Sequence, residues 1–450
     1  VLHLPPMPST PTVWLTTLGC AKNQVDSEKV EVMLEEAGYR LADSPESADV
    51  VMVNTCAFIE EAREESVDTI LEMQDTKRGD AHTVVIGCMA QRFGTEVVEA
   101  LPEVDAVLGL DRYGELVGTL DRLTGFGGNT VHLGTDIRRR PKMDILNLAN
   151  RPAPEFPYAY VKVAEGCDKP CTFCAIPLIR GKQRSRRPTE IRDEVAGLVN
   201  AGVREVVLVA QDLAAYGRDI DAPGAGIVDL LRFCSDVEGL DVLRLLYLYP
   251  KEIRPSLIEE IASNPKIATY FDLSLQHASV ALLRAMRRPG GGERYVELLD
   301  QIRSAAPEAA TRSSFIVGFP GETEDHVEEL AIFLETAQLD WVGLFPYSAE
   351  EGTPAAKMPS QVPGDVAMER LRHLQSIQDD ITQARNAAQV GRVEEILIDQ
   401  VEDGQAVGRS FRQAPEIDGV ILLDRGEVGE WVQAEIRGAF GTDLEATVTA

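Results

Sequence analysis

The residues with the clearest chemistry are three cysteines with the spacing C-x3-C-x2-C, namely Cys167, Cys171 and Cys174. Four thiolates usually hold a cubane iron–sulfur cluster. Three thiolates would leave one iron of such a cluster open to a small molecule. The next histidine, His277, is distant in the sequence, so no fourth ligand lies nearby. The spacing therefore favours a cluster with one open iron.

Two other uses of these cysteines fit the sequence less well. A structural zinc site needs four Cys or His ligands, usually in two close pairs. A disulfide framework is typical of short secreted chains, whereas this chain is long and has seven cysteines, an odd number. Its start, Val1 to Thr12, is rich in proline and lacks the charged and apolar regions of a secretory signal. We interpret that start as a disordered lead-in.

Size and charge limit the class of protein. The chain has 450 residues and a net charge of −29. Its length predicts two to four domains, and its 44% of hydrophobic residues predicts that these domains bury real cores. No apolar run approaches the roughly 20 residues that span a bilayer, so we expect a cytoplasmic protein without membrane contact. The negative surface would repel phosphate backbones and attract a basic partner. It could equally serve only solubility.

Residues 12–110 alternate short apolar strands with helices, which predicts a parallel α/β sheet. We expect the strands at 13–18, 50–53, 84–86 and 104–108, and the helices near 26–37, 59–73 and 95–100.

A second set of cysteines follows these strands: Cys20, Cys56 and Cys88. The carboxyl ends of parallel strands meet at one edge of a sheet, where ligands bind. The three thiols could therefore converge on a second metal cluster. The alternative is that each is an ordinary buried cysteine, as we expect for Cys234.

The rest of the chain divides into a connector, a second α/β region and an all-β end. Residues 125–157 are rich in glycine and proline and include the basic run 138–142, which is typical of an exposed linker. Six strand–helix units follow and suggest a partial barrel, with Cys167 after its first strand. We expect these strands at 160–164, 205–210, 242–248, 270–275, 313–317 and 341–345, a long helix at 365–389 and a small β-barrel at 392–448.

The cysteine spacing, with Phe173 just before the last cysteine, resembles the radical S-adenosylmethionine (SAM) signature. Nearly the whole chain resembles the methylthiotransferase family, and in particular the branch that modifies an aspartate of small-subunit ribosomal protein number twelve. Ser274, in a presumed loop, departs from the proline that this branch often has. The resemblance rests on the segments 18–23, 26–28, 53–56, 87–92, 174–182, 275–279 and 318–323.

The resemblance implies an α/β multidomain fold with three parts. These are an N-terminal parallel α/β domain at 10–125, a partial (β/α)6 radical-SAM barrel at 156–384 and a TRAM-like β-barrel at 387–450, with a linker at 126–155.

It also implies two 4Fe-4S clusters and SAM as cofactors. Cys167, Cys171 and Cys174 would hold the radical-generating cluster, and Cys20, Cys56 and Cys88 an auxiliary cluster that handles sulfur. SAM would supply both the methyl group and a deoxyadenosyl radical, because an unactivated C–H bond is beyond acid–base chemistry. No catalytic residue beyond the cluster ligands is implied. The SAM contacts would be Phe173, Gln211, Gln276 and Gly318, each of which could instead serve strand-end packing.

The basic run from Arg180 to Arg187 could neutralise carboxylates of SAM or substrate, although such a run is usually a solvated loop.

Three functions stay open at this point: the aspartate methylthiotransferase, a transfer-RNA methylthiotransferase of the same family, and a non-catalytic iron–sulfur protein that binds RNA. Residues 387–450 contain 13 acidic residues, five arginines and no lysine, which disfavours a phosphate-tracking groove. We therefore expect a basic ribosomal protein as substrate, an electron donor as a second partner and no direct contact with nucleic acid.

Overall fold

The computed structural model describes residues 10–126, 131–132, 145–221 and 224–449. The basic run at 138–142 lies outside these ranges, as do residues 1–9 of the expected lead-in and residues 127–128 of the glycine-rich stretch. No helix in these ranges is long and apolar enough to cross a membrane. The chain forms two compact units, and the segment Ala175–Lys182 belongs to the N-terminal unit, which otherwise ends at Pro152.

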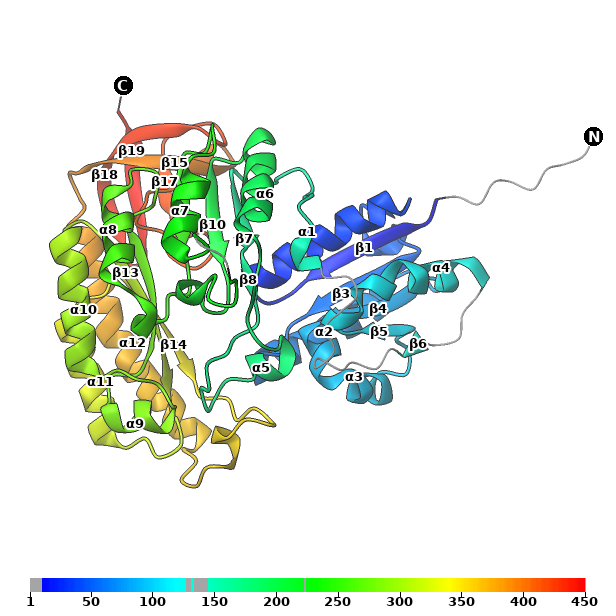
Figure 1. Cartoon of the computed structure of the whole chain (residues 1–450), viewed down its shortest axis with the longest axis horizontal. Coiled ribbons are helices and arrows are strands. Elements are labelled where there is room, and N and C mark those ends of the chain that lie inside the picture. Colours follow the sequence, from blue (N-terminus) through cyan, green and yellow to red (C-terminus); the bar gives the residue numbers. More distant parts are fainter. Residues whose placement is uncertain (1–9, 127–130, 133–144, 222–223, 450) are drawn as a thin grey trace, which may run out of the picture. The chain divides into compact units, whose positions relative to one another are not determined.

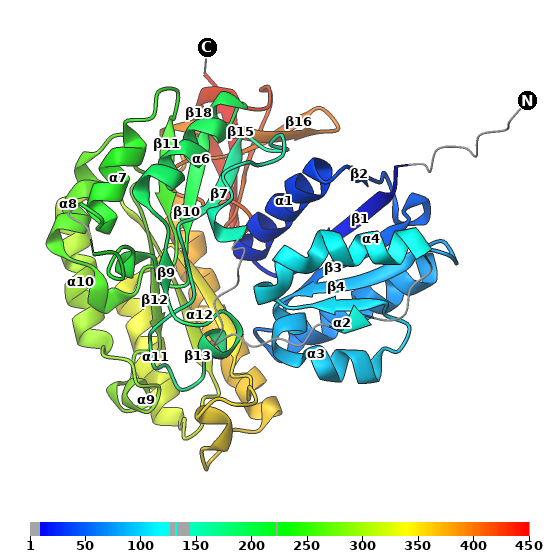
Figure 2. The same ribbon diagram turned by 45° about the vertical axis from the view of Figure 1, so that its right-hand side comes forward.

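The N-terminal unit is a parallel sheet with the strand order β2-β1-β3-β4-β5-β6. Apolar residues on one face of the sheet pack against α1 and α4, and those on the other face against α2 and α3 (Figures 1 and 2). Every residue of β3 is buried, as expected for a parallel strand covered on both sides. The strands are β1 (Thr12–Thr17), β2 (Arg40–Leu41), β3 (Val50–Thr55), β4 (His82–Gly87), β5 (Ala106–Leu108) and β6 (Val131–His132). The helices are α1 (Ala21–Glu36), α2 (Glu60–Thr76), α3 (Cys88–Ala100), α4 (Leu116–Phe126) and the short α5 (Ile176–Ile179).

The four strands predicted in this region are confirmed, but α3 begins earlier than the predicted helix at 95–100. Gly87 has φ +96, which lets the chain turn directly from β4 into the helix at Cys88. The helix also bends at Phe93, where φ is −128. The first half of the helix, before this bend, was therefore not predicted from the sequence. Parts of the expected connector join the unit as well: β6 pairs with β5, and Ile145 and Leu146 are buried.

The core of the C-terminal unit contains the six predicted parallel strands in chain order. They form two three-stranded sheets, and isolated bridges such as Leu248 with Leu273 join β11 to β12. The result is an open barrel with helices on its outer side (Figure 1). The strands are β7 (Tyr158–Lys162), β10 (Glu205–Val209), β11 (Val242–Leu245), β12 (Tyr270–Gln276), β13 (Ala310–Val317) and β14 (Trp341–Pro346), with the short pair β8 (Ala164–Glu165) and β9 (Arg184–Ser185). The helices are α6 (Pro188–Asn200), α7 (Ile227–Ser235), α8 (Pro255–Ser263), α9 (Val280–Ala285), α10 (Gly292–Ala305), α11 (Glu324–Ala337) and α12 (Gly364–Ala387).

Two expectations for this core need correction. The strand predicted at 242–248 ends at Leu245. Ser274 lies in β12 and not in a loop, and its backbone N–H donates to the carbonyl of Leu248 at 2.9 Å. A proline could not make that hydrogen bond. Cys234 is fully buried in the core, as predicted.

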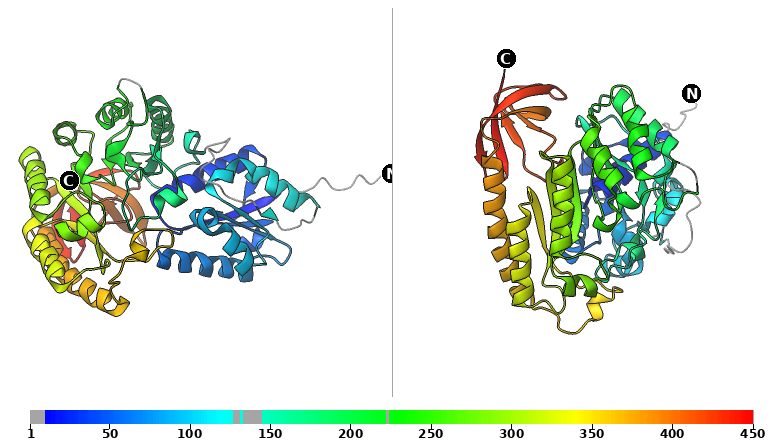
Figure 3. Two further views of the ribbon diagram at one scale, coloured as in Figure 1. Left: turned by 60° about the horizontal axis from the view of Figure 1, so that its bottom comes forward. Right: turned by 60° about the vertical axis from the view of Figure 1, so that its left-hand side comes forward.

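The all-β end is confirmed as a closed barrel with the order β15-β16-β17-β19-β18. Alternate residues of its strands, among them Ile396, Ile398 and Ile436, fill the interior. Figure 3 shows the barrel following α12 at one end of the core. The strands are β15 (Val393–Glu402), β16 (Gln405–Arg409), β17 (Ile421–Leu423), β18 (Trp431–Phe440) and β19 (Asp443–Val448).

The loop between β16 and β17 packs on the amino ends of the core strands. Its carbonyls accept hydrogen bonds from side chains in three of these strands: Tyr160 to Pro415 at 3.0 Å, Arg244 to Phe411 at 2.8 Å and Trp341 to Arg412 at 2.7 Å. The loop therefore closes the end of the core opposite to the strand ends that carry Cys167 and Gln276.

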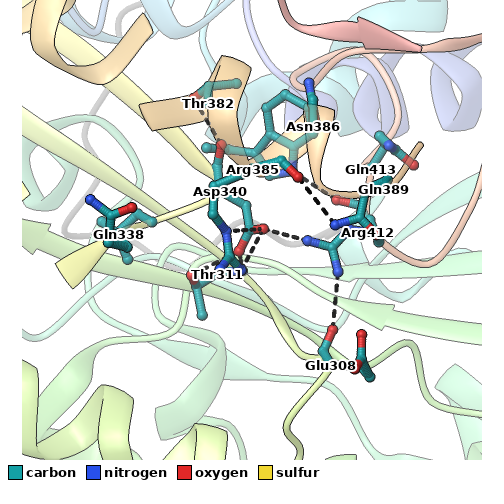
Figure 4. Close-up of polar contacts among 12 residues, drawn as sticks. Glu308, Thr311, Gln338, Asp340, Thr382, Arg385, Asn386, Gln389, Arg412 and Gln413 are labelled. Carbon is teal, nitrogen blue, oxygen red and sulfur yellow. Dashed lines mark hydrogen bonds and ion pairs between the residues drawn. The ribbon is translucent and has the colours of Figure 1, made fainter. Parts of the chain in front are cut away.

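The buried carboxylate of Asp340 anchors this loop (Figure 4). It accepts hydrogen bonds from the backbone N–H of Thr311 at 2.9 Å and from the guanidinium of Arg385 in α12 at 2.9 Å. The guanidinium of Arg412 in the loop donates to the same carboxylate and also to the carbonyl of Glu308. One acidic group thus joins β13, α12 and the barrel loop.

Candidate functional site

The three cysteines of the N-terminal unit follow neighbouring parallel strands, as predicted. Cys56 directly follows β3, Cys88 directly follows β4, and Cys20 comes three residues after β1. The strand order reverses between β1 and β3, and ligands of open parallel sheets bind at the carboxyl edge of such a switch point. The thiols of all three cysteines are close enough to influence one another's ionisation.

Glycines next to two of these cysteines keep the strand ends close. A Cβ on Gly19 would lie 2.8 Å from the Cβ and 2.9 Å from the Sγ of Cys56. A Cβ on Gly87 would lie 2.3 Å from the amide oxygen of Asn54. Both glycines also have φ +96, which larger residues rarely adopt. This compact cradle of thiols suits a soft metal cluster.

Burial acts to raise the pKa of all three thiols. The pKa of Cys88 rises to about 12, and that of Cys56 is also raised. At Cys20, burial is outweighed by the positive charges of Lys22 and Arg180 together with hydrogen bonds from the backbone N–H groups of Asn23 and Lys22, and the pKa lies below its usual value. Thiolates are the metal-binding form, so these charges favour the form of Cys20 that can bind metal.

The basic run differs from the solvated loop that we expected. Arg180 is buried in the N-terminal unit, where it donates to the Sγ of Cys88. Arg186 is buried in the C-terminal unit and forms an ion pair with Glu194 at 2.5 Å. Lys182 and Arg187 are exposed. Pairing with buried acceptors explains why two of these cations leave the solvent.

The other cysteine triplet occupies the loop after β8 in the C-terminal unit. The Sγ of Cys167 accepts the backbone N–H of Lys169 at 3.4 Å, and the Sγ of Cys171 accepts a guanidinium N–H of Arg288 at 3.4 Å. All three cysteines are partly exposed. Burial raises the pKa of Cys167 to about 11, although the hydrogen bond from the backbone N–H of Lys169 acts to lower it.

Lys169 holds this loop to the core. Its ammonium lies 3.2 Å from the carboxylate of Asp212, also pairs with Glu252 and lies 4.6 Å from the centre of the Tyr249 ring. Neither this anchor nor Arg288 was foreseen, because their partners are far away in the sequence. Lys169 could have been noticed because it lies inside the C-x3-C-x2-C motif, whereas no sequence pattern pointed to Arg288.

Three of the four predicted SAM contacts, Gln211, Gln276 and Gly318, lie at or just after strand ends of the core, whereas Phe173 lies in the cysteine loop. The side chain of Phe173 packs against the core, and Gln276 ends β12 with φ +73, a strained value for a residue with a side chain. The amide nitrogen of Gln211 donates to Glu165 at 2.9 Å, while its buried amide oxygen has no hydrogen-bond partner among the described residues. That orphaned acceptor suits a ligand with N–H or O–H groups.

Gly318 has a clear packing reason. A Cβ there would lie 2.5 Å from the Cβ of Ala367 in α12, and its φ is +81. Close approach to α12 therefore requires the glycine, whether or not a ligand also comes near.

No three His, Cys, Asp or Glu side chains in the described ranges are grouped as around a single metal ion. A cubane cluster gives each thiolate a different iron, so its ligands can stand farther apart. Each triplet offers the thiolates that such a cluster needs.

Comparison with family models divides the chain into three matched regions. Residues 12–109 match the uncharacterized protein family UPF0004, residues 161–334 the radical SAM superfamily, and residues 390–449 the TRAM domain.

Curated relatives match over nearly the whole length. Ribosomal protein uS12 methylthiotransferase RimO of Streptomyces avermitilis is 42% identical, covering 98% of this chain and 97% of the relative. The RimO proteins of Saccharopolyspora erythraea and Streptomyces coelicolor are also 42% identical and cover at least 95% of both chains. The chain belongs to the RimO family of ribosomal protein uS12 methylthiotransferases. Its fold, as predicted, is that of a multidomain radical SAM protein with a C-terminal TRAM barrel.

Solved structures share the fold of this RimO family member at low identity. The radical SAM methyltransferase TsrM of Kitasatospora setae, with cobalamin and a [4Fe-4S] cluster bound, has a TM-score of 0.53 at 16% identity, covering 77% of each chain. A second TsrM structure, with tryptophan and a SAM analogue, has a TM-score of 0.54 at 14% identity and covers 83% of this chain.

Proposed function

We propose that this protein is a radical SAM methylthiotransferase that places a methylthio group on the β-carbon of an aspartate in ribosomal protein uS12. One structural observation carries the proposal. One cysteine triplet lies at the carboxyl ends of three parallel strands of the N-terminal unit, and the other lies in the loop after β8 of the C-terminal unit. Such an arrangement provides two metal sites for one reaction. The identity of the substrate is inferred from the name of the RimO relatives, which specifies ribosomal protein uS12.

In this proposal Cys167, Cys171 and Cys174 hold the radical-generating 4Fe-4S cluster, and Cys20, Cys56 and Cys88 hold the auxiliary one. When bound, the clusters and SAM supply an electron, a carbon-centred radical, sulfur and the methyl group. The protein itself orients them. Lys169 and Arg288 fix the cysteine loop, and Phe173, Gln211, Gln276 and Gly318 lie where SAM would bind.

We further propose that the three parts have separate tasks. Residues 10–125 carry the auxiliary cluster, residues 156–384 cleave SAM, and residues 387–450 recognise the substrate. An electron donor completes the partners, and we expect the reaction in the cytoplasm.

The arginines of the barrel support a basic protein, not a nucleic acid, as its partner. Arg409 and Arg412 are buried in ion pairs with Glu205 and Asp340. Arg392 and Arg437 each pair with a glutamate. Few exposed positive charges are left to follow a phosphate backbone.

The choice of substrate can be tested with the reconstituted enzyme. We expect that anaerobic incubation with SAM, sulfide, a reductant and purified uS12 adds one methylthio group to one aspartate, as measured by mass spectrometry of the peptides. Transfer RNA in the same reaction should stay unmodified. Modified transfer RNA with unmodified uS12 would contradict the proposal in favour of the other branch.

Charge reversal in the barrel tests how uS12 is recognised. Glu395, Glu402 and Asp403 are exposed on β15 and the following turn. Replacing all three with lysine should raise the KM for uS12 by about tenfold at low salt, because each lost attraction costs up to about 1 kcal/mol. The difference should shrink at physiological salt, where the Debye length is about 8 Å.

SAM cleavage without uS12 should not change in this variant. The matched control reverses Asp325, Glu328 and Glu329, which are exposed on α11, and should keep the KM of the wild type. An equal rise in KM for both triple variants would mean that net charge alone, and not the barrel surface, governs binding.

A further inference from the structure

Arg180 is a buried cation at the cradle of the three N-terminal cysteines. Its side chain is 2% exposed. One terminal nitrogen lies 3.1 Å from the carboxylate of Asp26. The other lies 2.5 Å from the amide oxygen of Asn23 and 3.3 Å from the Sγ of Cys88. A guanidinium has a fixed fork of donors, so these contacts also fix its orientation.

The packing around Arg180 keeps it there. Ala175, just before the short helix α5, and Ile179, its last residue, are buried in the same apolar cluster as Cys88, Met89 and Ala90. The backbone N–H of Arg180 donates to the carbonyl of Ile176 at 2.7 Å and ends this helix. The packed apolar side chains therefore hold the backbone at Arg180 in place, while its guanidinium contacts the sulfur of Cys88.

Arg180 is not the only charged group beside these cysteines. Asp26 balances Arg180 on the side away from Cys88, and Lys22 lies near Cys20. Three thiolates carried by one cluster add negative charge to this buried region, and a further electron adds more. A hydrogen bond from a cation to a ligand sulfur stabilises the more negative form of a cluster.

We propose that Arg180 is a positioning residue of the auxiliary site, which holds Cys88 and raises the reduction potential of the cluster bound there. The inference rests on the proposed role of Cys20, Cys56 and Cys88 as cluster ligands. Asp26 acts in the opposite direction, because its carboxylate offsets the charge of Arg180.

The experiment uses the full chain with Cys167, Cys171 and Cys174 all replaced by alanine, so that only the auxiliary cluster can be reconstituted. Its reduction is followed by electron paramagnetic resonance during an anaerobic redox titration. Arg180→Met should lower the reduced-to-oxidised ratio at a fixed solution potential by about tenfold, a shift of about 59 mV for one electron. Arg180→Lys should recover part of the shift, and Asp26→Asn should shift the potential upward.

Arg288→Met is the matched control, since it removes an arginine of the triplet that this protein has lost, and it should leave the potential unchanged. If Arg180→Met takes up no cluster, the lysine and Asp26→Asn variants decide. If the Arg180 and Asp26 variants have the same cluster potential as the parent protein, the inference is overturned while the proposed function stays intact. Failure of the Arg180-containing protein to hold any cluster would overturn the ligand assignment itself, and the inference with it.

Discussion

Replacing Cys56 with alanine should abolish methylthiolation of uS12 and leave SAM cleavage in place, whereas Cys171→Ala should abolish both. Cys56 belongs to the triplet of the N-terminal unit, and Cys171 to the loop that would hold the SAM-binding cluster. Removing one thiolate from an iron–sulfur site with only three removes most of its hold on the metal. The measurements are deoxyadenosine release by chromatography and the mass of the uS12 peptides.

Iron content provides a second measurement on the same variants. Reconstituted wild-type enzyme should hold about eight irons, and each single variant about four. The matched control is Cys234→Ala, because this cysteine is buried in the apolar core of the C-terminal unit and belongs to neither triplet. It should keep about eight irons and full activity. Normal product formation by Cys56→Ala would refute the auxiliary role.

Asp340→Ala should destabilise the C-terminal unit by about 3–5 kcal/mol, because it leaves two arginines without their shared buried carboxylate. Arg412 is almost fully buried, and Arg385 is about one-third exposed, so most of the cost arises at Arg412. The loss should appear as a lower Tm in calorimetry and as easier proteolysis of the barrel.

Glu402→Ala, at the exposed end of β15, is the control and should change stability by no more than about 0.5 kcal/mol. A Tm for Asp340→Ala equal to that of the control would show that the barrel loop does not depend on this network. Asp340→Asn should recover part of the loss, since an amide oxygen can still accept from Thr311 and Arg385.

The strands and the cysteine cradle were predictable because local pattern determines them. Apolar runs such as Val50–Val53 form parallel strands, and parallel strands bring Cys20, Cys56 and Cys88 to one edge. The same logic placed the other triplet after the first strand of the core.

The partners of the buried charges were not predictable in this way. Arg180 stands in a basic run that is typical of solvent, yet Asp26 and Cys88, which pair with it, are distant in sequence. The loop at Arg412 likewise reaches Asp340 only after the barrel and the core have both formed. Contacts of this kind depend on tertiary packing, which leaves no periodic signal in the chain.

The central claim is best tested by mass spectrometry of uS12 from cells with and without this gene. The account predicts that one aspartate of uS12 carries a methylthio group in the parent cells and loses it in the deletion strain. The wild-type gene should restore the modification, and the Cys171→Ala gene should not. An unmodified uS12 in the parent cells, or a modification that persists after deletion, would contradict the account.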